Sequence, residues 1–176
     1  MAWKGAITLI TGPSGCGKSL FCLRSVTEAR AQGVTVGGVL SPGRYVAGTK
    51  INIDVIDLSG NERRSLATLR GEEDAAHTHA ALLTTRWSFD APAMAWANGV
   101  LQRATPCHLL IVDELGPLEW LQNRGWVAGI EAVSARAYDA ALVVVRPSLM
   151  PLAQARWPDA ALLDLGLPAS NPPKQI

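Results

Sequence analysis

The sequence lacks an excess of charge of either sign. It carries 16 Lys and Arg residues against 15 Asp and Glu residues, which gives a formal net charge of +1. Proteins that bind nucleic acid or an anionic membrane generally present a basic field that this balance does not provide. We therefore expect neither nucleic acid nor a membrane as a partner, and the sequence indicates no particular protein partner.

Cysteines and long apolar runs are also scarce. The three cysteines, Cys16, Cys22 and Cys107, are odd in number and lack the spacing of a disulfide framework, so we interpret them as reduced thiols. The apolar stretch MAWKGAITLITG at the N-terminus is too short to span a bilayer, and it leads into a glycine-rich turn instead of a cleavage site. The sequence therefore predicts a cytoplasmic protein without a targeting segment.

The composition is typical of one folded domain. Of the 176 residues, 48% are hydrophobic and 18% are charged, which is enough apolar surface for a proper core. Runs of β-branched residues alternate with stretches of helical periodicity, a pattern that predicts an α/β three-layer sandwich. We expect the domain to cover residues 1–168 and the Pro-rich residues 169–176 to form a flexible tail.

Individual elements follow from periodicity and turn residues. Residues 50–69 alternate between apolar and polar around a Ser-Gly-Asn turn, which predicts a hairpin that extends a mostly parallel sheet in the antiparallel sense. Residues 70–86 are expected to be loop with some helix. The remaining strands are expected at 5–10, 34–40, 86–89, 107–116, 139–145 and 160–165, and the helices at 19–33, 90–104, 125–138 and 148–157. The first helix is expected to turn one apolar face inward, formed by Leu20, Cys22, Leu23, Val26 and Ala29.

Residues 12–19 carry the strongest chemical signal. They fit the pattern G-x-x-x-x-G-K-[ST] between a predicted strand and a predicted helix, which is the context of a phosphate loop. Glycines let backbone N–H groups approach phosphates, and the helix N-terminus adds partial positive charge. Lys18 is expected to contact the β- and γ-phosphates as a catalytic residue, and the Ser19 hydroxyl to bind Mg²⁺. The predicted nucleotide-binding residues are Gly12, Pro13, Ser14, Gly15, Cys16, Gly17, Lys18 and Ser19.

A second motif ends the strand at 107–116. The apolar run HLLIV is followed by Asp113 and Glu114, and two adjacent carboxylates at the tip of a buried strand need a compensating charge. A phosphate-bound Mg²⁺ supplies it, so Asp113 is the predicted metal ligand. Glu114 is the predicted catalytic base that orients and deprotonates an attacking water.

These motifs resemble a known family. The stretch VDELGPLEW at 112–120 is similar to the signature of a small family of P-loop nucleoside-triphosphatases, whose human member is called cancer-related nucleoside-triphosphatase. The resemblance covers roughly residues 5–165 and implies a RecA-like fold and slow, Mg²⁺-dependent hydrolysis of ATP, GTP and other triphosphates with little base preference. It also implies that Gly116 and Pro117 turn the chain sharply past the nucleotide. Glu119 corresponds to the last acid of the signature, and Leu118 stands where the family has Met.

Two arginines are candidates for stabilising transition-state charge. Arg44, in SPGRYVAG, aligns with an arginine that follows the second strand in the family, and Arg146 ends a predicted strand. An arginine at the γ-phosphate accelerates transfer strongly, and sites of open α/β sheets gather at the carboxyl ends of strands. Residues 70–89, before the helix expected at 90–104, do not match well the R-x-G-x-Y pattern that the family usually has there.

Three functions fit these motifs. The first is a Mg²⁺-dependent nucleoside triphosphatase with broad base specificity. The second is a small-molecule or nucleotide kinase that uses the same phosphate loop, although no arginine-rich lid is evident and a carboxylate after the metal ligand favours water as the acceptor. The third is a switch protein whose nucleotide state controls a partner.

Overall fold

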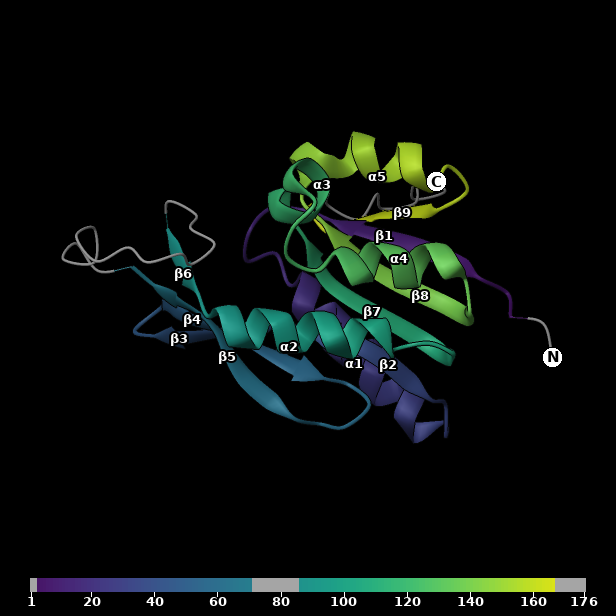
Figure 1. Cartoon of the computed structure of the whole chain (residues 1–176), viewed down its shortest axis with the longest axis horizontal. Coiled ribbons are helices and arrows are strands. Elements are labelled where there is room, and N and C mark those ends of the chain that lie inside the picture. The colour runs from purple at the N-terminus through teal and green to yellow at the C-terminus, as the bar shows by residue number, and fades with distance from the viewer. Residues whose placement is uncertain (1–2, 71–85, 167–176) are drawn as a thin grey trace, which may run out of the picture.

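The computed structural model describes residues 3–70 and 86–166, and in it helices cover both faces of a central sheet (Figure 1). Most of the segment expected to be loop with some helix, and all of the expected C-terminal tail, lie outside the described residues. Every helix of the described part is too short or too polar to cross a bilayer.

The sheet combines a parallel core with an antiparallel extension. Its order is β6-β5-β4-β2-β7-β8-β1-β9, with β3 paired to β4. The pairs β2–β7, β7–β8, β8–β1 and β1–β9 are parallel, whereas all pairs made by β3, β4, β5 and β6 are antiparallel. The predicted fold, a mostly parallel sheet extended by an antiparallel hairpin, is therefore confirmed. The strands are β1 (Ala6–Thr11), β2 (Val36–Leu40), β3 (Gly43–Val46), β4 (Thr49–Asp57), β5 (Arg63–Leu69), β6 (Trp87–Phe89), β7 (Cys107–Leu115), β8 (Tyr138–Val145) and β9 (Ala161–Asp164).

The helices form the two outer layers. On one face of the sheet lies α1, whose Cys22 and Val26 join a core cluster with Ile10, Ile111 and Val144. The other face is covered by α2 and α4, which lie side by side in front of the sheet, with α3 and α5 at the end near β1 and β9 (Figure 1). The helices are α1 (Lys18–Ala31), α2 (Ala91–Gln102), α3 (Pro117–Gln122), α4 (Val127–Ala135) and α5 (Met150–Arg156), the last preceded by a 3-10 turn at Pro147–Leu149.

The central strand β7 shows why the sheet is covered on both faces. Leu110 and Val112 belong to the core beneath α2 and α4, whereas Ile111 belongs to the core beneath α1. Because successive strand residues point to opposite faces, a continuous apolar run is what a strand buried on both sides requires. At the start of α2, the predicted cap is also present: the Asp90 carboxylate accepts a hydrogen bond from the Ala93 N–H at 2.6 Å.

Three features differ from the expectations. Strand β3 pairs with β4 around Ala47 and Gly48, both with positive φ, and was not predicted. Gly116 and Pro117 do not simply turn the chain: they begin α3, because proline suits the first position of a helix. In α1 only the stripe of Cys22 and Val26 is buried, while Leu20 and Leu23 are 51% and 44% exposed, so their predicted burial is wrong. Phe21 and Ala29 are partly buried and pack against the same core cluster as Cys22 and Val26.

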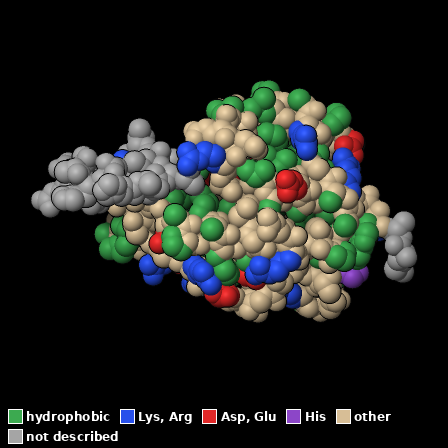
Figure 2. Space-filling model, in the orientation of Figure 1, with side chains coloured by type: hydrophobic (Ala, Val, Ile, Leu, Met, Phe, Trp, Pro, Cys, Tyr) green, Lys and Arg blue, Asp and Glu red, His purple; other side chains and the backbone are tan. Residues whose placement is uncertain are grey.

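The surface carries a few exposed apolar residues. Leu121 on α3 and Leu152 on α5 are exposed, and hydrophobic side chains are numerous at that end of the face shown in Figure 2. Basic and acidic side chains are interspersed over the rest of this face (Figure 2).

Candidate nucleotide-binding site

The phosphate loop leaves the carboxyl end of β1 and runs directly into α1. Gly12, Gly15 and Gly17 all have positive φ, and Gly17 is the residue that precedes the helix. Residues with a side chain rarely adopt this backbone conformation, so glycine suits each of the three positions. At Gly12 a Cβ atom would also lie 2.7 Å from the Cys16 Sγ and 3.0 Å from the Gly166 backbone nitrogen, so the loop is closed tightly against the turn after β9. The loop therefore has the backbone shape that the motif predicts.

The Lys18 side chain folds back over this loop. Its ammonium donates to the Gly12 carbonyl at 2.7 Å and to the Pro13 carbonyl at 2.8 Å, and it lies 3.8 Å from the Cys16 Sγ. These carbonyls hold the positive charge at the N-terminus of a helix of 14 residues, where backbone N–H groups favour anions.

Asp113 is the buried acid of the site. Its carboxylate accepts the Ser41 N–H at 2.9 Å and a hydrogen bond from the Ser19 side chain, while the Ser41 hydroxyl donates to its backbone carbonyl at 2.5 Å. Burial raises the pKa of Asp113 to about 6, even though the bonds from Ser41 and Ser19 oppose this shift. The structure thus brings together Ser19 and Asp113, the two predicted metal ligands. Ser41 was not foreseen, because its position depends on the pairing of β2 with β7.

Glu114 is redirected by an irregularity in β7. Asp113 pairs with Val144 and Leu115 pairs with Val145, so the register with β8 shifts at Glu114. Such a bulge re-aims a side chain that a regular strand would point to the opposite face from its neighbour. Glu114 consequently forms an ion pair with the Nε of Arg146, which follows β8; their side chains are 36% and 52% exposed. Both residues were predicted separately, and the structure places them in contact.

Arg44 has a different partner. It lies on β3, its side chain is 61% exposed, and its Nε is 3.6 Å from the Asp54 carboxylate on β4. Of the two candidate arginines, Arg146 is therefore the one that the structure joins to the predicted base.

Lys50 was missed by sequence reasoning. It lies near the start of β4, and its stem crosses Gly43, where a Cβ atom would come within 2.2 Å of the Lys50 Cε. The acids that act on its ammonium are Glu114 and Asp113. No motif marks this lysine, because it belongs to the antiparallel extension and reaches the site only through the folded sheet.

Glu119, the last acid of the signature, has a structural role. Its carboxylate is buried and accepts the N–H of Gly116 and the N–H of Trp126, both at 2.8 Å. Gly125 must be glycine, because it has a φ of 71° and a Cβ atom there would lie 2.2 Å from a Glu119 oxygen. Glu119 therefore ties the start of α3 to the start of α4 directly behind the tip of β7.

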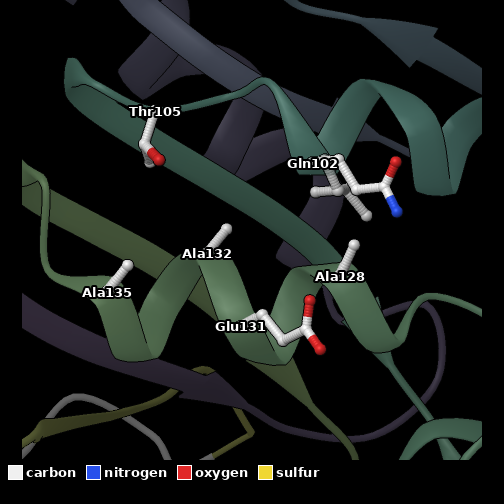
Figure 3. Close-up of a pocket in the computed structure, with 7 residues that line it drawn as sticks. Gln102, Thr105, Ala128, Glu131, Ala132 and Ala135 are labelled. Carbon is white, nitrogen blue, oxygen red and sulfur yellow. The ribbon is translucent and has the colours of Figure 1, made fainter.

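A groove elsewhere on the molecule contains none of the predicted site residues. It has a volume of about 190 Å³ and lies between α2 and α4, where the small side chains of Ala128, Ala132 and Ala135 face Gln102 and Thr105 (Figure 3). The candidate site is instead the carboxyl-terminal edge of the parallel strands, where the phosphate loop, Asp113, Glu114 and Arg146 gather.

This arrangement defines the class of protein: an α/β protein with the fold of P-loop nucleoside-triphosphatases. A family model described as NTPase matches residues 7–154, and the chain belongs to this family. The resemblance noted in the sequence is thereby confirmed.

Individual relatives agree with this assignment. Nucleoside-triphosphatase THEP1 of Methanopyrus kandleri is 30% identical over 140 residues, which cover 78% of this chain and 71% of the relative. The protein of the same name from Thermococcus kodakarensis is 26% identical over 65% of this chain and 62% of its own length, so the chain spans about two thirds of these relatives. The solution structure of a human cancer-related nucleoside triphosphatase has a TM-score of 0.64 at 21% identity, covering 94% of this chain and 90% of that protein, and shares the fold.

Proposed function

We propose that the chain hydrolyses the terminal phosphoanhydride bond of nucleoside triphosphates in a Mg²⁺-dependent reaction with broad base specificity. The observation that carries the proposal is the meeting of three groups at one edge of the sheet: the phosphate loop after β1, Asp113 bonded to Ser19, and Glu114 paired with Arg146. The names of the relatives, nucleoside-triphosphatases, support hydrolysis as the reaction.

The residues present fit a Mg²⁺ ion. Mg²⁺ in nucleotide sites takes one or two protein oxygens and otherwise phosphate and water oxygens, and Ser19 and Asp113 provide these two oxygens side by side. Burial penalises the Asp113 anion, which a bound cation would relieve. Bound Mg²⁺ would neutralise charge that develops on the phosphate oxygens.

Lys18 and the loop bind the triphosphate. The carbonyls of Gly12 and Pro13 now hold the Lys18 ammonium, and a phosphate oxygen, which carries full negative charge, is a stronger acceptor than either carbonyl. Backbone N–H groups of residues 12–17 and the N-terminus of α1 bind the same phosphates. These residues would bind the phosphates that all nucleoside triphosphates share, and we propose broad base specificity for this reason.

Glu114 acts on the attacking water, and Arg146 orients Glu114. The Glu114 carboxylate accepts a proton from water while the water oxygen bonds to the γ-phosphorus. The bond from that phosphorus to the β-phosphate oxygen breaks, and nucleoside diphosphate and inorganic phosphate leave. Arg146 holds the Glu114 carboxylate in place through their ion pair, so Arg146 is a positioning residue.

Glu114→Gln tests the assignment. The amide keeps the size of the side chain but cannot accept the proton, so phosphate release in a single turnover should fall by roughly 10²–10⁴-fold. Binding of Mg²⁺ and nucleotide should persist because Lys18, Ser19 and Asp113 remain. ATP and GTP should be hydrolysed by the wild type at rates within about an order of magnitude of each other, which is roughly 1.4 kcal/mol in activation free energy.

Glu131→Gln is the matched control, since Glu131 is an exposed residue of α4, and its hydrolysis rate should equal that of the wild type. Unchanged hydrolysis in Glu114→Gln would contradict the role of Glu114 as the base. Phosphate transfer from ATP to a small-molecule acceptor in preference to water would identify a kinase instead.

A further inference from the structure

Lys50 is a half-buried cation beside Gly43, which lies two residues after Ser41, the residue whose N–H binds the Asp113 carboxylate of the candidate site. Its stem runs over Gly43, where the absence of a side chain leaves room for it: a Cβ atom there would lie 2.2 Å from the Lys50 Cε and 3.0 Å from its Cδ. The ammonium lies 5.7 Å from the centre of the Trp87 ring on β6. Contacts with β3 and β6 thus fix the direction in which this side chain points.

The charges around the ammonium are those of the site. Burial lowers the pKa of Lys50; Glu114 and then Asp113 raise it, and Arg146 and Arg86 lower it further. The two acids already have other partners, since Glu114 pairs with Arg146 and Asp113 accepts hydrogen bonds from Ser41 and Ser19. None of the ion pairs found within residues 3–70 and 86–166 includes Lys50.

A cation withdrawn from water needs an anion nearby. Arg44, the family's candidate from this part of the chain, is mostly exposed and pairs with Asp54, so Lys50 is better placed to supply positive charge. It approaches from the antiparallel extension, whereas Lys18 approaches from the phosphate loop on the far side of β8 and β7.

We propose that Lys50 binds the terminal phosphoryl group of the bound nucleoside triphosphate and thereby distinguishes a triphosphate from a diphosphate. This inference rests on the proposed function. An ammonium offers three donors, and the terminal phosphoryl group carries most of its charge on three oxygens, which retain it as the group is transferred. Lys50 therefore contributes to binding of the triphosphate and to the rate, but not to binding of the diphosphate product.

The experiment compares Lys50→Met and Lys50→Gln with Lys50→Arg, and uses Lys4→Met, at an exposed position near the N-terminus, as the control. Calorimetric titration of each variant with nucleotide, in buffer that contains Mg²⁺, measures the affinity for ADP and for an ATP analogue with an imido bridge between the β- and γ-phosphates. Single-turnover phosphate release from ATP measures the rate, and thermal unfolding verifies that each variant is folded.

Lys50→Met and Lys50→Gln should weaken binding of the ATP analogue by about 10- to 100-fold and leave ADP binding unchanged, because one hydrogen bond to a charged group is lost. Their rate of phosphate release should fall by roughly 10²-fold, as for loss of one positioned donor. Lys50→Arg should recover part of the affinity for the ATP analogue and part of the rate of phosphate release. Lys4→Met should match the wild type in both measurements.

Two results would overturn this role of Lys50: equal losses for the ATP analogue and ADP, or no loss for either. Because the ratio of the two affinities requires no hydrolysis, it separates this inference from the proposed function. A wild type that binds both nucleotides without hydrolysing ATP would refute the proposed function alone, and the ratio would still decide the role of Lys50. A wild type that binds neither nucleotide would refute both.

Discussion

Asp113→Asn should increase the stability of the protein free of nucleotide and metal at neutral pH, while it weakens Mg²⁺ dependence and nucleotide binding together. In the folded protein the Asp113 pKa is raised from 3.8 to about 6 by burial. The folded state therefore binds this proton more tightly than the unfolded state does. The resulting stabilisation is complete below about pH 3.8, decreases as the pH rises, and is lost above about pH 6.

The size of the effect follows from the shift. About two pKa units at roughly 1.4 kcal/mol each give up to about 3 kcal/mol by which the ionised carboxylate destabilises the fold above pH 6. Asparagine is similar in size, carries no charge, and retains an oxygen that can accept the Ser41 N–H. The variant should therefore exceed the wild type in free energy of unfolding by up to about 3 kcal/mol at neutral pH, and this advantage should vanish near pH 4.

Urea unfolding of both proteins with a metal chelator present, followed by tryptophan fluorescence at several pH values, measures this difference. Adding Mg²⁺ and a nucleotide should then stabilise the wild type and have little effect on the variant, because ligand binding to the folded state alone raises stability. A difference of the same size at pH 4 and at neutral pH would show that packing, and not the carboxylate charge, is responsible. A variant less stable than the wild type at neutral pH would refute the reasoning.

The other predictions concern Lys18 and Glu119. Lys18→Ala should abolish turnover and greatly weaken triphosphate binding, measured by titration, while the thermal midpoint without nucleotide hardly changes, since the contacts of the Lys18 ammonium, to two loop carbonyls and the Cys16 Sγ, are at partly buried or exposed positions; turnover close to that of the wild type would contradict the phosphate-loop assignment. Glu119→Ala should reduce the free energy of unfolding by about 2–5 kcal/mol in urea titrations, because it leaves the buried N–H groups of Gly116 and Trp126 without their acceptor; a loss below about 1 kcal/mol would show that these groups find other partners.

Features encoded in neighbouring residues could be predicted from the sequence. The phosphate loop is defined by glycines that need positive φ and by the strand and helix beside it, all within residues 6–31. The two-sided burial of β7 follows from its unbroken apolar run, and the start of α2 follows from Asp90 as a cap. Each of these signals acts over a few residues, so no knowledge of the sheet order is required.

Features that depend on strand pairing could not be predicted. The ion pair between Glu114 and Arg146 requires β7 beside β8 and a register shift at Glu114. Lys50 approaches the candidate site only because β4 folds back and pairs with β3 and β2. The short elements β3 and α3 also lack a signal, since four or six residues are too few to show a periodicity.

The pairing of β1 also affects how the protein is assembled during synthesis. The two neighbours of β1 in the sheet, β8 and β9, begin at Tyr138 and Ala161, so β1 is made before the other strands of the described sheet and is paired last among them. At the usual speed of translation, the synthesis of Tyr138 follows that of Thr11 by roughly 6 to 25 seconds. During that time the nascent chain can close its antiparallel strands, which are contiguous in sequence, but it has no partner strand for β1. We therefore expect that nucleotide does not assist the early stages of folding, because the strand that leads into its binding loop has no partner strand until β8 and β9 have been made.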